Sequence, residues 1–125
     1  MAQMLFKVDP AGSGNGREIR GPATLGEIVE GECLQVLDVF MASEQGNFLA
    51  GVWTCTPGTM KLTDYPFNEM AVLIEGRIEI TDEDSGVTTS FGPGEALAIS
   101  KGFRGTWHMP EPVLKRFAAE IPKAG

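Results

Sequence analysis

Apolar and polar residues alternate over several short segments of the chain, and this period of two is typical of β-strands. In the segment Leu34–Phe40, Gln35 and Leu37 share one face, whereas Val36 and Asp38 share the other. Pro-Gly and other turn residues separate such segments, so the spacing predicts a β-sandwich or β-barrel. The other strands predicted in this way are Phe48–Cys55, Glu69–Glu75, Ile78–Thr81, Val87–Phe91, Ala96–Ile99 and Val113–Glu120.

The first third of the chain shows a different pattern. Met4–Val8 is a candidate first strand, and the Gly-rich residues Asp9–Gly16 form a candidate flexible loop. Thr24 and Glu27 have the spacing of a capping box, which predicts a short helix at 24–30. We therefore expect residues 1–33 to form an extension that packs on the barrel or on a partner chain, and residues 34–125 to form the barrel.

Composition and charge narrow the class of protein. The 125 residues suffice for one domain with its own core, and 16 Gly and 8 Pro agree with many short elements joined by turns. The net charge of −7 disfavours binding to nucleic acid or to anionic membranes. No apolar run approaches the roughly 20 residues of a membrane helix. Met1–Lys7 does not resemble a signal peptide, so we expect a cytoplasmic protein.

Few residues are available for metal or nucleophilic chemistry. Cys33 and Cys55 are the two cysteines, and their spacing fits neither a zinc site nor a redox motif. We interpret both as reduced thiols in the core. His108 is the single histidine, so one chain cannot build a site with several imidazole ligands. We expect His108 at the surface or at a dimer contact.

Two segments resemble the paired motifs of the cupin superfamily. Glu69, six further residues and Gly76 match the end of the first motif, and Gly94 and Gly102 match the second. The resemblance is closer to small cupins typified by ureidoglycine aminohydrolase and to the cupin domain of an ethanolamine-utilisation protein. It covers roughly residues 48–120, and it implies a double-stranded β-helix, which is a jelly-roll barrel and usually a dimer. The segments that carry it are Gly51-Val52-Trp53, Tyr65-Pro66-Phe67-Asn68-Glu69, Phe91-Gly92-Pro93-Gly94-Glu95 and Gly102-Phe103-Arg104-Gly105-Thr106-Trp107.

The sequence departs from this family where a cupin metal would be bound. Cupins hold a divalent ion with two His and a Glu of the first motif and one His of the second. Here the positions of the two first-motif histidines fall among Leu62–Tyr65, and the position of the second-motif histidine falls at Gly105. None of these residues is a histidine, so Glu69 is the one ligand that remains. One carboxylate is too little to hold a transition metal firmly. We therefore predict no metal ligands and no cofactor, with a divalent metal left as the alternative although the usual His ligands are absent, and the metal-dependent ureidoglycine activity does not transfer.

Strand alternation still predicts a site inside the barrel. If Glu69 faces the interior, Lys115 and Tyr65 are candidates to act with it in acid–base chemistry, or to satisfy it as a purely structural pair. Either Lys115 or Arg104 is a candidate cation for a desolvated Glu69. The aromatic residues could stack on a ligand or simply pack the core. The predicted ligand-binding residues are Trp53, Trp107, Arg104 and Met109.

Three functions remain open at this point. The first is a metal-poor cupin that binds a small polar metabolite with Glu69 as the anchor, which predicts a pocket with an unpaired polar group. The second is an enzyme of hydrolase or isomerase type, which predicts a second titratable group within hydrogen-bond reach of Glu69. The third is a dimeric scaffold or accessory protein, which predicts a filled barrel. The expected partners are a small-molecule ligand and a second copy of the chain.

Overall fold

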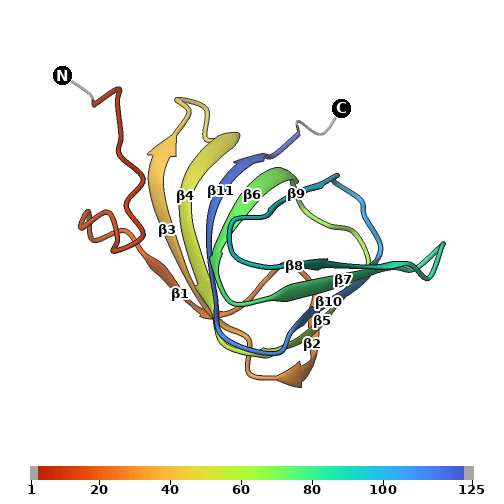
Figure 1. Cartoon of the computed structure of the whole chain (residues 1–125). Helices are drawn as coiled ribbons and strands as arrows, with labels where there is room; N and C mark the ends of the chain where they lie inside the picture. The colour runs from red at the N-terminus through yellow and green to blue at the C-terminus, as the bar shows by residue number, and fades with distance from the viewer. Residues whose placement is uncertain (1–2, 123–125) are drawn as a thin grey trace.

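Residues 3–122 fold into eleven β-strands that form two antiparallel sheets (Figure 1). The computed structural model describes residues 3–122. Within that range, no helix has the length and apolar character needed to cross a membrane. The strands are β1 Ile19–Pro22, β2 Glu27–Gly31, β3 Leu34–Ala42, β4 Phe48–Cys55, β5 Gly58–Leu62, β6 Asn68–Glu75, β7 Ile78–Asp82, β8 Thr88–Phe91, β9 Ala96–Ile99, β10 Gly105–Met109 and β11 Val113–Glu120.

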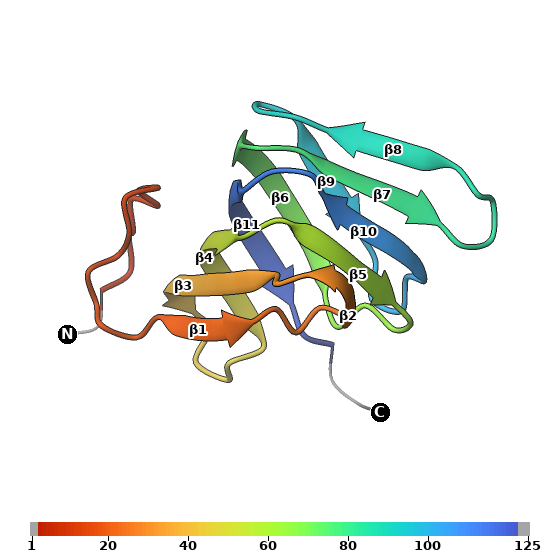
Figure 2. The ribbon, with the colours of Figure 1, turned by 90° about the horizontal axis from the view of Figure 1, so that it is seen from below.

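The two sheets face each other, and the core fills the space between them. One sheet has the order β1-β3-β4-β11-β6-β9 and the other has the order β2-β5-β10-β7-β8. Figure 2 shows the strands of the second sheet side by side, with β8 at its edge. Strands that are distant in sequence, such as β4 and β11, are neighbours. This is the all-β, jelly-roll arrangement that the sequence predicted.

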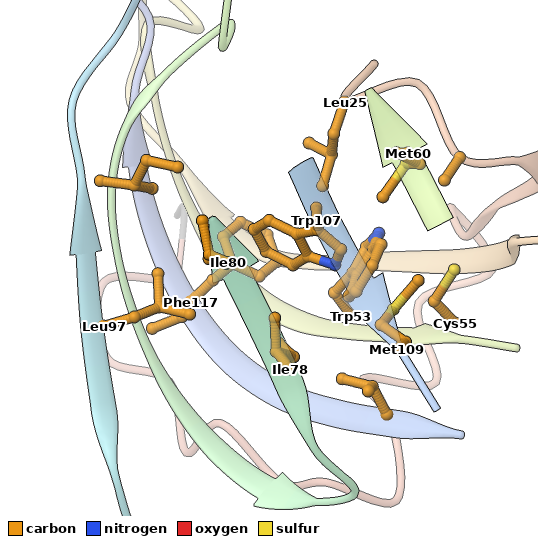
Figure 3. Close-up of a cluster of buried hydrophobic side chains, with 14 of the residues drawn as sticks. Leu25, Trp53, Cys55, Met60, Ile78, Ile80, Leu97, Trp107, Met109 and Phe117 are labelled. Carbon is orange, nitrogen blue, oxygen red and sulfur yellow. The ribbon is translucent and has the colours of Figure 1, made fainter. Parts of the chain in front are cut away.

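Alternation along the strands separates core-facing from outward-facing side chains. On β10, Gly105, Trp107 and Met109 are buried, whereas Thr106 and His108 between them are half-buried. The same period of two holds on β11. Figure 3 shows the resulting core cluster, in which side chains of both sheets meet around Trp53 and Trp107.

Two glycines allow neighbouring strands to approach closely. A Cβ atom on Gly51 of β4 would overlap the carbonyl oxygen of Asp38 on β3. A Cβ atom on Gly105 of β10 would overlap the carbonyl oxygen of Thr81 on β7. Glycine is therefore required at both positions for a steric reason, and no role in binding is needed to explain it.

The predicted helix at residues 24–30 is wrong, because most of that segment is strand β2. Its residues pair with β5, with Glu27 opposite Lys61 and Gly31 opposite Gly58. Hydrogen bonds to a neighbouring strand outweigh the local capping preference of Thr24. The predicted first strand at Met4–Val8 is also wrong, because that segment has no strand partner.

The segment before β1 lies on the outer face of the six-stranded sheet (Figure 1). The Ser13 backbone N–H and hydroxyl both donate to the carboxylate of Asp38, at 2.7 and 2.6 Å. The Arg116 Nε donates to the carbonyl oxygen of Val8. Residues 19–22 then pair with β3 and residues 27–31 with β5. Residues 19–22 and 27–31 are thus strands of the two sheets, while the division at residue 33 and an exchange with a partner stay predictions.

Candidate functional site

Glu69 is a buried carboxylate on β6, which lies between β11 and the edge strand β9 of the six-stranded sheet. It lies on β6 opposite Ala119 of β11 and Ile99 of β9, and its side chain is 3% exposed. An isolated buried carboxylate is strongly disfavoured unless it is paired and hydrogen-bonded. Both of its oxygens have partners: Tyr65 Oη donates to Oε1 at 2.8 Å and Lys115 Nζ donates to Oε2 at 2.5 Å.

Lys115 supplies the cation for Glu69 from the neighbouring strand β11. Its side chain is 2% exposed, and its ammonium lies 4.7 and 4.8 Å from the ring centroids of Trp53 and Trp107. The faces of aromatic rings attract a cation electrostatically, most strongly when water is excluded. The two indoles and the Glu69 carboxylate therefore form a polar enclosure for one positive charge inside an otherwise apolar barrel.

Tyr65 reaches Glu69 from the loop between β5 and β6. Its backbone is fixed by hydrogen bonds with Phe103 and Gly102, and Gly102 has a left-handed φ of 89°. Its ring stacks on Trp107 with the planes 10° apart. Burial, followed by the Glu69 charge and the hydrogen bond to it, holds the pKa of the Tyr65 hydroxyl well above its usual value. Tyr65 therefore stays a proton donor to Glu69 at physiological pH.

A small cavity borders the charged pair. Its volume is about 40 Å³, which is enough for roughly three water molecules. Glu69, Lys115 and Gln35 provide its polar groups, and the rest of the wall is apolar. The apolar lining residues are Leu25, Leu37, Leu49, Trp53, Phe67, Phe117 and Ala119.

Gln35 is a site residue that the prediction missed. It is buried on β3, and its Oε1 accepts a hydrogen bond of 2.8 Å from Trp53 Nε1. This bond fixes the indole whose face contacts the Lys115 ammonium. A signal was present in the sequence, because Gln35 shares a strand face with the apolar Leu37 and an amide on a core face needs a buried partner.

Trp107 and Met109 lie in the core cluster (Figure 3). Trp107 contacts the Lys115 ammonium and Tyr65, but it does not line the cavity. Its Nε1 is buried and has no hydrogen-bond partner within residues 3–122. Its ring meets that of Trp53 edge to face, at 82° and 6.0 Å between centroids. Met109 is fully buried and also lies away from the cavity lining.

Arg104 lies outside the site, contrary to the prediction. Its side chain is 59% exposed and pairs with Glu83 at 2.9 Å. The residue precedes β10, in a loop where its side chain extends into solvent, so Lys115 alone of the two candidate cations reaches Glu69. His108 faces away from the core, as expected, and its Nδ1 lies 2.7 Å from Thr59 Oγ1.

The residues around Glu69 do not fit a cupin metal. Both carboxylate oxygens accept hydrogen bonds, and the group nearest Oε2 is an ammonium, which repels a divalent cation. Tryptophan and lysine in its charged form are not metal ligands. Across the described chain, no cluster of three or more His, Cys, Asp or Glu side chains could hold a metal ion. The positive charge at this position belongs to the polypeptide itself.

Both cysteines are buried thiols. Burial is the main cause that raises the pKa of Cys55 to about 12, and burial also raises the pKa of Cys33. A thiol with a raised pKa carries little thiolate and is a poor nucleophile. Neither cysteine is therefore a candidate for nucleophilic chemistry.

Comparison with known proteins identifies the class of protein that this fold and site define, which is a cupin. Residues 42–117 match the family described as the EutQ-like cupin domain. The chain belongs to that family, and the resemblance seen in the sequence is confirmed. No curated protein matches the chain.

Several solved structures share the fold. A protein of unknown function from Pseudomonas syringae aligns with a TM-score of 0.70 and 19% identity, over 90% of this chain and 46% of that one, so this chain spans about half of that relative. The EutQ protein of Clostridium difficile aligns with a TM-score of 0.60 and 16% identity, over 93% and 81%. The polyketide cyclase RemF of Streptomyces resistomycificus aligns with a TM-score of 0.66 and 16% identity, over 98% and 83%. At these identities the likeness concerns the fold.

Proposed function

We propose that the protein binds a small metabolite in the barrel, with Glu69 and Lys115 holding its polar group and Tyr65 holding Glu69 in place. The observation that carries this proposal is a buried ion pair whose two residues line a small cavity. Binding sites for small molecules commonly combine an apolar wall with a few convergent polar groups.

The geometry indicates the chemistry of the ligand. Lys115 can donate to an oxygen acceptor, and Glu69 can accept from a hydroxyl or amino donor. Leu37, Leu49 and Phe117 offer apolar contact to a short carbon chain. The cavity of about 40 Å³ favours a molecule of only a few heavy atoms. The site works without a metal in this proposal, because the ammonium already supplies the positive charge.

A second candidate function is acid–base catalysis at the same residues. Two titratable groups, Tyr65 and Lys115, lie within hydrogen-bond reach of Glu69. Such a triad can hold and move a proton next to a bound substrate. The hydrolase and isomerase classes considered from the sequence both fit this arrangement.

Isothermal titration calorimetry tests binding directly. The full chain is titrated with short carboxylates, ureido compounds, alcohols and carbonyl compounds. We expect at least one class to bind, and the variant Glu69→Gln to bind it at least about tenfold more weakly, since a hydrogen bond to a charged group contributes about 1.5–3 kcal/mol. Arg104→Gln is the matched control and should leave affinity unchanged. Failure of every class to bind would favour the scaffold alternative.

We further propose that the protein is a dimer. Met70, on the outer face of β6, is 58% exposed beside a shallow apolar surface that includes Val8 and Val72. Apolar surface of this kind favours contact with another protein surface. Light scattering coupled to size exclusion should give twice the mass of the chain, and Met70→Glu should reduce it to one chain.

A further inference from the structure

We propose that Lys115 is a covalent carbonyl site, at which its amine condenses with a small aldehyde or ketone held in the cavity to form an imine. This inference rests on the proposed function, because it requires that the cavity binds a small molecule. It adds the class of substrate and a bond between the substrate and a named atom, Lys115 Nζ.

The first argument is the placement of the amine. Lys115 borders the cavity, and its side chain is almost wholly removed from water. Imine formation needs the neutral amine as the nucleophile, so a group that takes the proton of the ammonium must lie beside it.

The second argument is the adjacent base. Glu69 Oε2 lies 2.5 Å from Lys115 Nζ, so the proton can pass from the ammonium to the carboxylate within one hydrogen bond. That transfer also removes two opposite charges from a region of low dielectric. Tyr65 donates to the other carboxylate oxygen, and it acts as a positioning residue that holds Glu69 in place.

The protons and electrons balance without any further reactant. The Lys115 ammonium gives one proton to Glu69, and the nitrogen lone pair forms a C–N bond while the carbonyl π pair moves to oxygen. A second proton passes from nitrogen to that oxygen, which gives a carbinolamine. Glu69 then returns its proton to the hydroxyl group as the C–O bond breaks. The products are water and an iminium ion with the single positive charge that the ammonium carried.

The third argument is that the surroundings stabilise this product. The iminium nitrogen occupies the place of the ammonium, next to Glu69 Oε2 and near the centroids of Trp53 and Trp107. Rings that attract an ammonium also attract an iminium, because both interactions are electrostatic. The apolar wall next to it, which includes Leu49 and Phe117, fits a short alkyl group on the carbonyl carbon.

Reductive trapping tests the proposal. The full chain is incubated with limiting propanal and sodium cyanoborohydride near neutral pH, and the modified lysines are located by peptide mass spectrometry. Lys61 and Lys101 are exposed and serve as internal controls. We expect one propyl group on Lys115 before these two lysines react. Modification of Lys61 and Lys101 with Lys115 unmodified would overturn the proposal.

Variants separate chemistry from folding. Glu69→Gln should lower the trapping rate at Lys115 by roughly a hundredfold, the usual contribution of general acid–base catalysis, with the rate at Lys61 unchanged. Lys115→Met should remove the adduct. If Lys115→Met does not fold, the double variant Glu69→Gln/Lys115→Met takes its place, because it lacks both charges of the buried pair. It should likewise form no adduct at position 115. Trapping that is equally fast in Glu69→Gln would contradict the role of Glu69.

A parallel titration separates this inference from the proposed function. Propan-1-ol and propionate have the same chain length as propanal, but neither can form an imine. Binding of either one without trapping of propanal would overturn the imine and leave the binding function intact. Absence of both binding and trapping would overturn both proposals.

Discussion

At the scale of single residues, the buried pair of Glu69 and Lys115 is the part of the barrel interior where loss of one side chain should matter most. Each side chain is at most 3% exposed, so each charge depends on the other and on its hydrogen bonds. A buried pair contributes little net stability, but removal of one partner leaves an uncompensated charge. Removal of one partner should therefore lower the free energy of unfolding strongly, whereas removal of both partners should change it little.

This asymmetry gives a first prediction. Lys115→Met should lower the free energy of unfolding by about 3–5 kcal/mol, whereas Glu69→Gln/Lys115→Met should recover most of that loss. Urea denaturation followed by fluorescence measures both values. Arg104→Met, which breaks the exposed pair with Glu83, is the control and should cost at most about 1 kcal/mol. A double variant as unstable as Lys115→Met would contradict this account.

The two tryptophans allow a second comparison. Trp53 Nε1 donates to Gln35, whereas Trp107 Nε1 has no partner among the described residues. The substitution Trp→Phe removes the same volume at both positions, but only Trp53→Phe leaves a buried amide oxygen unsatisfied. We expect Trp53→Phe to be more destabilising than Trp107→Phe by about 1–2 kcal/mol. Thermal and urea unfolding would measure the difference, and an equal loss would show that Trp107 has a donor interaction as well.

At the scale of elements, the segment before β1 covers part of the outer sheet face. Phe40 and Val52 are buried although they lie outside the main core cluster, and Asp38 beside them is held by Ser13. Residues 3–18 form no strand, and hydrogen bonds such as those of Ser13 to Asp38 help to attach them to the sheet. This makes the covering segment a separate, weaker unit of the fold.

A third prediction tests that attachment. Asp38→Ala leaves the Ser13 backbone N–H and hydroxyl without their acceptor and should cost about 1–3 kcal/mol. Limited trypsin digestion should also cut faster at Arg17, because the loop before it detaches more often. Asp64→Ala, at an exposed pair with Lys101, is the control and should change stability by less than about 0.5 kcal/mol. Unchanged proteolysis in Asp38→Ala would show that other contacts hold the segment.

The same scale shows what sequence reasoning could and could not predict. The period-two pattern located β3, β4, β6 and β11, and it grouped Lys115 with Val113 and Phe117 on one strand face, which is buried in the structure. It failed at β2, where pairing with β5 decides the structure and local capping signals do not. It also failed for Arg104, because a residue just before a strand has no alternation to fix its direction. Gln35 was missed because the rule that a buried amide needs a hydrogen-bond partner was not applied to this core-facing residue.

At the scale of the whole molecule, the burial of weakly acidic side chains makes the stability of the fold depend on pH in the alkaline range. The pKa of Cys55 is raised to about 12, and that of Tyr65 is raised well above its usual value, in both cases mainly by burial. In the unfolded chain these groups lose their protons near their ordinary values of about 8.5 and 10. Above those values the folded state binds more protons than the unfolded state, so stability falls as pH rises.

This linkage gives a fourth prediction. The free energy of unfolding should decrease from about pH 8.5 upward, and more steeply above about pH 10, when both groups contribute. Burial also raises the pKa of Cys33, so the double variant Cys33→Ala/Cys55→Ala should remove the first part of the decrease and Tyr65→Phe the second, because alanine and phenylalanine do not titrate. Urea denaturation at a series of pH values from neutral to strongly alkaline measures the slopes at constant ionic strength. Tyr65→Phe also removes the donor to Glu69, so its stability at neutral pH is lower than that of the parent chain, and the slope is the quantity to compare. A slope that both variants leave unchanged would mean that other groups, such as the exposed lysines, set the alkaline limit of the fold.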